Sequence, residues 1–136
     1  MPHDEEWVRL WLAKAEHDLA AAEKLAESSP IFPEIICFHA QQAVEKYLKA
    51  FLVYHNVEFE KVHAIRYLLD LCGVIDASFE NLREMAEPLT VYAVIGRYPM
   101  AGPVITSKDS DAAIAVSKDV RAFVLSRLPE NIITEE

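Results

Sequence analysis

The stretch PEIICFHAQQAVEKYLKAFLVYH, residues 33–55, decides the fold of this 136-residue chain. Apolar side chains recur in it at steps of three and four, which places them on one face of an α-helix. That stripe consists of Ile36, Ala40, Ala43, Tyr47, Phe51 and Tyr54, broadened by Val44 and Leu48. Pro33 suits the first helical position, because its missing N–H would be unpaired there in any case. We predict that a helix this apolar lies at the centre of the fold.

Two polar lines flank the stripe. The first consists of Glu34, Gln41 and Glu45, and the second of His39, Gln42, Lys46 and Lys49. The second line has two interpretations. It can line a groove that binds a nucleotide or RNA, or it can be a solvated helix face on which Glu45 and Lys49 pair at i, i+4.

The same spacing predicts one helix before this stretch. It runs from about Asp4, whose carboxylate can cap it, to about Ser28, and Pro30 stops it. Its apolar stripe consists of Val8, Trp11, Ala15, Leu19, Ala22 and Ala26.

Three helices are predicted after the stretch. A short one begins at His63 and ends at Gly73, which suits the C′ position. A second runs from about Phe79 to Ile95 behind a cap at Asp76 or Ser78, and its inner stripe is Phe79, Leu82, Ala86, Leu89 and Ala93. Pro88 falls inside it and predicts a bend, because an interior proline costs ~3 kcal/mol. The last helix is capped by Ser107 and ended by Pro129, with Ala113, Val116, Val120, Phe123 and Leu128 inward.

The helices together favour an all-α fold, an antiparallel up-and-down bundle of four long helices plus one short helix. We expect a single domain over residues 1–130 and a flexible acidic tail over 131–136.

The composition and charge of the chain exclude several classes of protein and of binding site. Hydrophobic residues make up 52% of the chain and exclude wholesale disorder, and the 3 glycines argue against a glycine-rich phosphate loop. Six of the 22 acidic residues lie at the two ends, so the body is nearly neutral in a chain of net charge −9. Such a balance excludes a generic polyanion binder but leaves room for a local basic patch. No apolar run reaches the ~18 residues of a membrane span, and with no basic-then-apolar leader we expect a cytoplasmic protein.

Metal ligands and reactive thiols are not predicted. Cys37 and Cys72 are expected to be reduced core residues, since two thiols cannot build a zinc site alone. The acidic residues near the amino end have no histidine at metal-site spacing. We therefore expect neither a metal nor a cofactor.

Three segments resemble a known family. CFHAQQAVEKYLKA at residues 37–50 resembles the second-helix signature of the HEPN family. His63-Ala64-Ile65 followed by Leu68-Leu69 resembles that family's next helix, and Arg97-Tyr98-Pro99 resembles its usual Arg-Tyr-Pro ending. The resemblance covers about residues 7–128.

This resemblance implies an up-and-down bundle that usually forms a homodimer. Small HEPN proteins are often encoded beside a minimal nucleotidyltransferase, and many such pairs behave as toxin and antitoxin. Many members are metal-independent endoribonucleases, which carry an Arg followed by a His after four to six residues. In them the His is thought to move the proton of a ribose 2′-OH while the Arg steadies the phosphate.

This sequence departs from that nuclease motif, because no His follows Arg97 at the required spacing. His63 is the candidate to meet Arg97 in space, although it can also be a plain helix-start residue. Arg97 itself either stabilises a helix carboxyl end or binds phosphate. Tyr98 either packs at a dimer seam or stacks on a base.

Two function hypotheses follow. In the first, the chain is a nucleotide- or RNA-binding and interaction module, the partner of a minimal nucleotidyltransferase in a toxin–antitoxin-type system. Its ligand-binding residues are Arg97, Tyr98, His39, Gln42, Lys46 and Lys49. In the second, it is a metal-independent endoribonuclease with Arg97 and His63 as catalytic residues.

Overall fold

The computed structural model describes residues 5–95 and 104–133, and every regular element in these two ranges is a helix. Three helices are long: α1 (Glu5–Ala26), α2 (Pro33–Tyr54) and α6 (Ser107–Leu125). The shorter α-helices are α3 (Ile65–Ile75), α4 (Arg83–Ala86), α5 (Tyr92–Ile95) and α7 (Glu130–Ile133), and the 3₁₀ helices are η1 (Ala77–Leu82) and η2 (Glu87–Val91). The predicted all-α class is confirmed.

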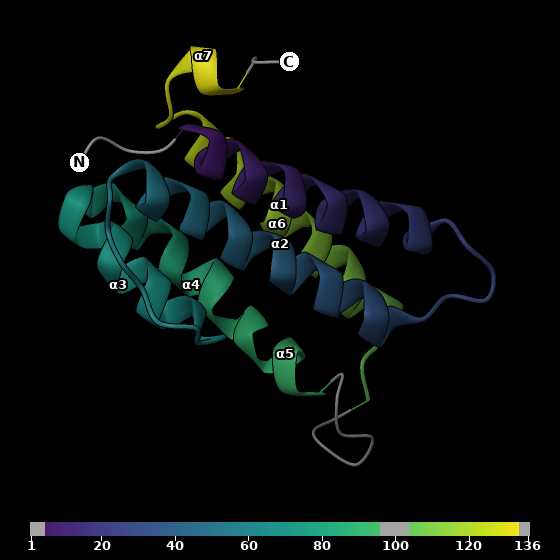
Figure 1. Cartoon of the computed structure of the whole chain (residues 1–136). Coiled ribbons are helices and arrows are strands. Elements are labelled where there is room, and N and C mark those ends of the chain that lie inside the picture. Colours follow the sequence, from purple (N-terminus) through teal and green to yellow (C-terminus); the bar gives the residue numbers. More distant parts are fainter. Residues whose placement is uncertain (1–4, 96–103, 134–136) are drawn as a thin grey trace.

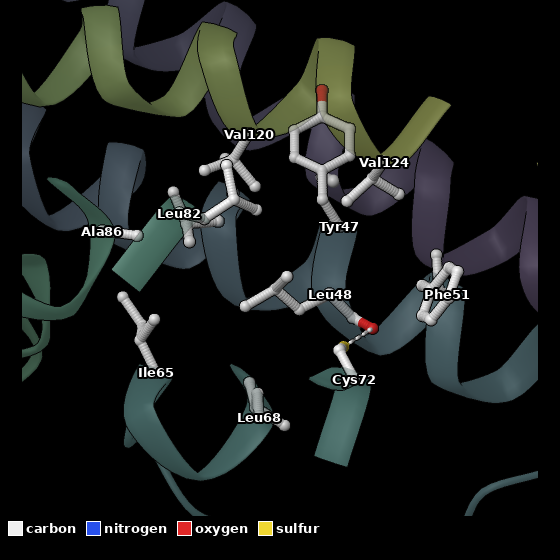
Figure 2. Close-up of a cluster of buried hydrophobic side chains, with 14 of the residues drawn as sticks. Tyr47, Leu48, Phe51, Ile65, Leu68, Cys72, Leu82, Ala86, Val120 and Val124 are labelled. Carbon is white, nitrogen blue, oxygen red and sulfur yellow. Dashed lines mark hydrogen bonds between the residues drawn. The ribbon is translucent and has the colours of Figure 1, made fainter. Parts of the chain in front are cut away.

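The central helix is α2, as its apolar stripe predicts. It packs against α1, α6 and α3, and α1 lies alongside it in the opposite direction (Figure 1). Leu48 of α2 lies close to Cys72 of α3, whose Sγ is 3.8 Å from the Leu48 carbonyl oxygen (Figure 2). Val120 and Val124 of α6 close the core from the other side, beside Tyr47. One contiguous apolar core therefore has α2 as its axis.

The third helix starts and stops later than predicted. It begins at Ile65 rather than His63, and it continues through Gly73 to Ile75. The prediction of Gly73 as the C′ residue is wrong, because a glycine can stay helical at a cost of only ~1 kcal/mol. The helix ends instead at Asp76, where the backbone turns extended and the carboxylate accepts the Ser78 N–H. Asp76 thus caps η1, one of the two caps predicted there.

The fourth predicted helix is the main departure. Residues 77–95 form η1, α4, η2 and α5 in succession rather than one helix with a bend. Pro88 lies in the first turn of η2, where its missing N–H and its ring stop the α-helical pattern of α4. The predicted inner stripe is nevertheless buried at every position: Phe79, Leu82, Ala86, Leu89 and Ala93.

The carboxyl-terminal part also differs from the prediction. Thr106, not Ser107, caps α6, in a capping box with Asp109. The helix ends at Leu125, before Pro129. Residues 131–133 were predicted to be part of a flexible tail, but they belong to α7, whose Ile132 side chain is only 2% exposed. Ile132 reaches the core, and Arg9 of α1 donates to its carbonyl oxygen at 3.3 Å, so both contacts hold α7 against α1.

Among the residues described, no helix has both the length and the hydrophobicity that crossing a bilayer requires. Asp4, the predicted cap of α1, and residues 134–136 of the predicted tail lie outside the described residues.

Candidate functional site

Asp18 of α1 joins two members of the predicted polar line of α2. Its Oδ1 lies 2.9 Å from His39 Nδ1, and its Oδ2 accepts a hydrogen bond from Lys46 Nζ at 2.6 Å. These contacts form because α1 and α2 pack along their length, which brings residue 18 beside residues 39 and 46. The charge of Lys46 is thus already paired within the chain.

Glu45 is the centre of a second, deeper cluster. Its side chain is 2% exposed and accepts a hydrogen bond from the Gln41 amide. Its Oε1 lies 3.5 Å from Lys49 Nζ and 3.2 Å from His63 Nδ1. A buried carboxylate is tolerated only when it is paired and hydrogen-bonded, and these three partners meet that condition. Gln42 extends the network, since its Nε2 donates to Gln41 Oε1 at 2.9 Å.

His63 is held between the interior and the solvent. Its Nδ1 faces Glu45, whereas 47% of its side chain is exposed. Its Nε2 has no hydrogen-bond partner within the described ranges. A carboxylate on one ring nitrogen fixes the tautomer and leaves the other nitrogen for proton transfer. The pair of Glu45 and His63 therefore has the geometry of an acid–base group.

Lys49 is covered rather than solvated. Its Nζ lies over two aromatic rings, 5.3 Å from the centroid of Trp11 and 5.7 Å from that of Phe59. The two rings meet edge to face at 6.1 Å, so the segment after α2 closes over the lysine. The ion pair of Glu45 and Lys49 exists, but the prediction of a solvated face is wrong at these positions because both residues are buried.

An open cavity of about 350 Å³ adjoins these residues. It is lined by Trp7, Leu10, Trp11, Lys14 and Lys46. The cavity wall is mainly apolar, and two lysines belong to it. The apolar stripe predicted for this helix, α1, includes Trp11 but not Trp7, and sequence reasoning did not single out Lys14. The signal that it missed is the i, i+4 spacing of Trp7 and Trp11, with Lys14 three residues further on the same side of α1.

The structure thus brings together five of the predicted site residues. His39 and Lys46 share Asp18, Lys49 and His63 share Glu45, and Gln42 reaches Glu45 through Gln41. We name the charged set the basic cluster, and it consists of Lys14, His39, Lys46, Lys49 and His63 with the carboxylates Asp18 and Glu45. Arg97 and Tyr98 lie outside the described residues.

A separate polar contact ties three helices together. Arg121 of α6 donates to Glu16 of α1 at 2.7 Å, and the buried Tyr47 hydroxyl donates to the same carboxylate. Burial raises the pKa of Tyr47, and the bond to Glu16 raises it further. Burial alone would raise the pKa of Glu16, but the bonds from Arg121 and Tyr47 outweigh it and lower that pKa. This contact is structural, since Tyr47 stays protonated at neutral pH.

The two cysteines are buried, and burial raises the pKa of Cys37 to about 11 and that of Cys72 to about 12. Thiols with such pKa values are unreactive at neutral pH. In the described part of the chain no three His, Cys, Asp or Glu side chains converge as metal ligands would.

The sequence matches the HEPN domain over residues 8–128. The chain belongs to the HEPN domain family. This HEPN chain is also similar to two solved structures. TT1696 from Thermus thermophilus is 29% identical, with a TM-score of 0.74 over 89% of this chain and 98% of that one. ST0689, described as an archaeal HEPN homologue, is 25% identical, with a TM-score of 0.71 over 88% of this chain and 96% of that one. No curated protein matches the chain in sequence.

Proposed function

We propose that this HEPN chain is a binding and interaction module that recognises the phosphate of a nucleotide or of RNA. The observation that carries the proposal is the basic cluster. In a chain of net charge −9, two lysines and two histidines contact the two carboxylates of the cluster, and a third lysine, Lys14, lines the adjoining cavity with Lys46. Positive groups beside exposed aromatic rings are typical of proteins that bind single-stranded nucleic acid. Arg97 and Tyr98 belong to the same proposal as further phosphate- and base-binding residues.

The interaction part of the proposal concerns a protein partner. Small HEPN proteins are often paired with a minimal nucleotidyltransferase, and membership of the family supports the same pairing here, in a toxin–antitoxin-type system with this chain as a homodimer. A small nucleotidyltransferase gene adjacent to this one, and copurification of its product with this chain, would support the pairing. An isolated gene would count against it.

Binding can be tested with a short fluorescein-labelled single-stranded RNA, followed by anisotropy over a range of salt concentrations. We expect Lys46→Ala and Arg97→Ala to weaken binding, each lowering the salt slope by about 0.7. Lys118→Ala is the matched control, because Lys118 is an exposed lysine of α6 paired with Glu23. Wild-type protein that does not bind the RNA at low salt would refute the proposal.

A second candidate function, a metal-independent endoribonuclease, is favoured by the contact of Glu45 with His63. The carboxylate orients His63 to accept the proton of a ribose 2′-OH, and Arg97 would steady the phosphate. We expect cleavage of single-stranded RNA in EDTA that is lost in His63→Gln and in Arg97→Ala. His17→Gln, which changes an exposed histidine of α1, is the control. Intact RNA after incubation with the wild type would remove this candidate and leave the binding module.

A further inference from the structure

We infer that the cavity beside the basic cluster is a subsite for one nucleoside 5′-phosphate unit, with the base on the tryptophans and the phosphate on the lysines. This inference rests on the proposed function and gives it a location. The cavity lies along the amino-terminal half of α1, next to Lys46 of α2, and is lined by that lysine with Trp7, Leu10, Trp11 and Lys14.

The apolar wall of the cavity includes the two aromatic side chains of Trp7 and Trp11. Trp11 is braced by two neighbours, because Lys49 Nζ lies 5.3 Å from the centroid of its ring and the Phe59 ring meets it edge to face. Trp7, one turn earlier on α1, is 55% exposed, and Leu10 beside it is 48% exposed. A braced ring loses little freedom when a flat ligand stacks on it, and every nucleobase has a π-face for such stacking.

Two lysines line the cavity, and they differ in their ion pairing. Lys14 makes no ion pair with any residue that the structure describes. Lys46, which also lines the cavity, is held at 2.6 Å by Asp18, so its ammonium group has a fixed position. An anion entering the cavity would meet Lys14 directly and would share Lys46 with Asp18. The site therefore fits a ligand with one flat apolar part and one anionic group.

Size and charge favour a single nucleotide over the other occupants. A volume of about 350 Å³ lies at the lower end of small-molecule sites, roughly 300–1,000 Å³, and suits one base with its sugar. A second copy of the chain docking here by two-fold symmetry would place each partner's Lys14 in or near a shared apolar contact, where like charges repel. A nucleoside phosphate instead brings a negative charge that can pair with Lys14, which has no ion-pair partner among the described residues.

The chain offers a built-in probe for the test, because its 2 tryptophans are both in the cavity wall. Intrinsic fluorescence is followed while AMP, ribose 5-phosphate or inorganic phosphate is added, and calorimetry supplies the affinities. We expect AMP to quench and saturate the signal and to bind at least about fivefold more tightly than ribose 5-phosphate, the smallest gain typical of one stacked base.

Three variants test which residues contact the base of the ligand and which contact its phosphate. Trp7→Ala should weaken the affinity for AMP at least about fivefold and leave the affinity for ribose 5-phosphate unchanged, and the fluorescence of Trp11 still reports binding. Lys14→Met should weaken both compounds. Lys24→Met is the control, since it removes a charge from the other end of α1. Thermal unfolding by circular dichroism confirms that each variant is folded.

The outcomes separate this inference from the function on which it rests. If RNA binds but AMP and ribose 5-phosphate bind equally, or Trp7→Ala leaves AMP affinity intact, the subsite is refuted and the binding module stands. If neither RNA nor any phosphate compound binds, both fail. If Trp7→Ala converts a dimer into a monomer by light scattering and leaves AMP affinity unchanged, the cavity is an interface between copies, and the subsite is refuted.

Discussion

The pairing of Glu45 with Lys49 yields a quantitative prediction, because both side chains are almost out of water, with 2% and 11% of their areas exposed. Glu45→Gln keeps the shape and the bond from Gln41 but removes the charge. Breaking one side of a buried ion pair costs about 3–5 kcal/mol, and the 3.5 Å separation places this pair at the lower end of that range. We expect the free energy of unfolding to fall by about 3 kcal/mol.

A double-mutant cycle separates the charge pair from the packing. Lys49→Met replaces the ammonium group by a thioether that packs well against Trp11 and Phe59. The double variant leaves no unpaired charge at residues 45 and 49, so its free energy of unfolding should fall by less than about 1.5 kcal/mol. Even if Lys49→Met alone cost nothing, the coupling energy between the two sites should then be at least about 1.5 kcal/mol.

Urea denaturation followed by far-UV circular dichroism gives these free energies, and the single Glu45→Gln change should lower the Tm by roughly 10 °C. Glu84→Gln is the control, because Glu84 is exposed on α4 and should change stability by no more than about 0.5 kcal/mol. Additive effects of the two cluster changes, or a cost below about 1 kcal/mol for Glu45→Gln, would refute the assignment of a buried charge pair.

Three further predictions use the rest of the structure. Because burial raises the pKa of Cys37 to about 11 and that of Cys72 to about 12, stability should be full below the ordinary thiol pKa of 9.0. Above pH 9.0 the free energy of unfolding should fall by about 1.4 kcal/mol per pH unit for each thiol. Urea denaturation of Cys72→Ala in reducing buffer should show a shallower fall of this free energy with pH. Tyr47→Phe should cost about 1–3 kcal/mol, since its hydroxyl donates to the Glu16 carboxylate. The lowered pKa of Glu16 stabilises the fold at neutral pH, and this contribution is lost as pH falls through that pKa, so acid titration of Tyr47→Phe should show a smaller loss. Thr106→Ala should lower the free energy of unfolding by about 1 kcal/mol, measured by thermal unfolding, whereas Ser107→Ala should leave it unchanged.

The core could be predicted from the sequence because it depends on spacing alone. Ile36, Ala40, Ala43, Tyr47 and Phe51 of the predicted stripe are all buried. The same argument predicted the buried positions of residues 79–93, yet it gave the wrong helix there. An apolar stripe specifies which side faces inward, but it does not tell one long α-helix from a series of α and 3₁₀ turns. A proline can break the α-helical pattern and leave the inward side intact.

The site was only partly predictable, because its contacts join residues far apart in the chain. The polar line of α2 was visible as a pattern, but its partner Asp18 lies 21 residues before His39 and 28 before Lys46. Nothing local distinguishes Asp18 from the other acids of α1. The burial of Lys49 likewise depends on Phe59, which comes from the segment after α2.

If the chain binds phosphate as we propose, the two carboxylates of the basic cluster explain how a protein of net charge −9 does so selectively. Asp18 and Glu45 neutralise the lysines nearest to them, so the face has little long-range attraction for polyanions. A phosphate gains at Lys46 only by competing with Asp18, and it therefore needs a second source of binding energy. If the adjoining aromatic cavity is the proposed subsite, it supplies that second source for ligands that carry a base. Selectivity would then come from the stacked ring, and the charges would orient the phosphate.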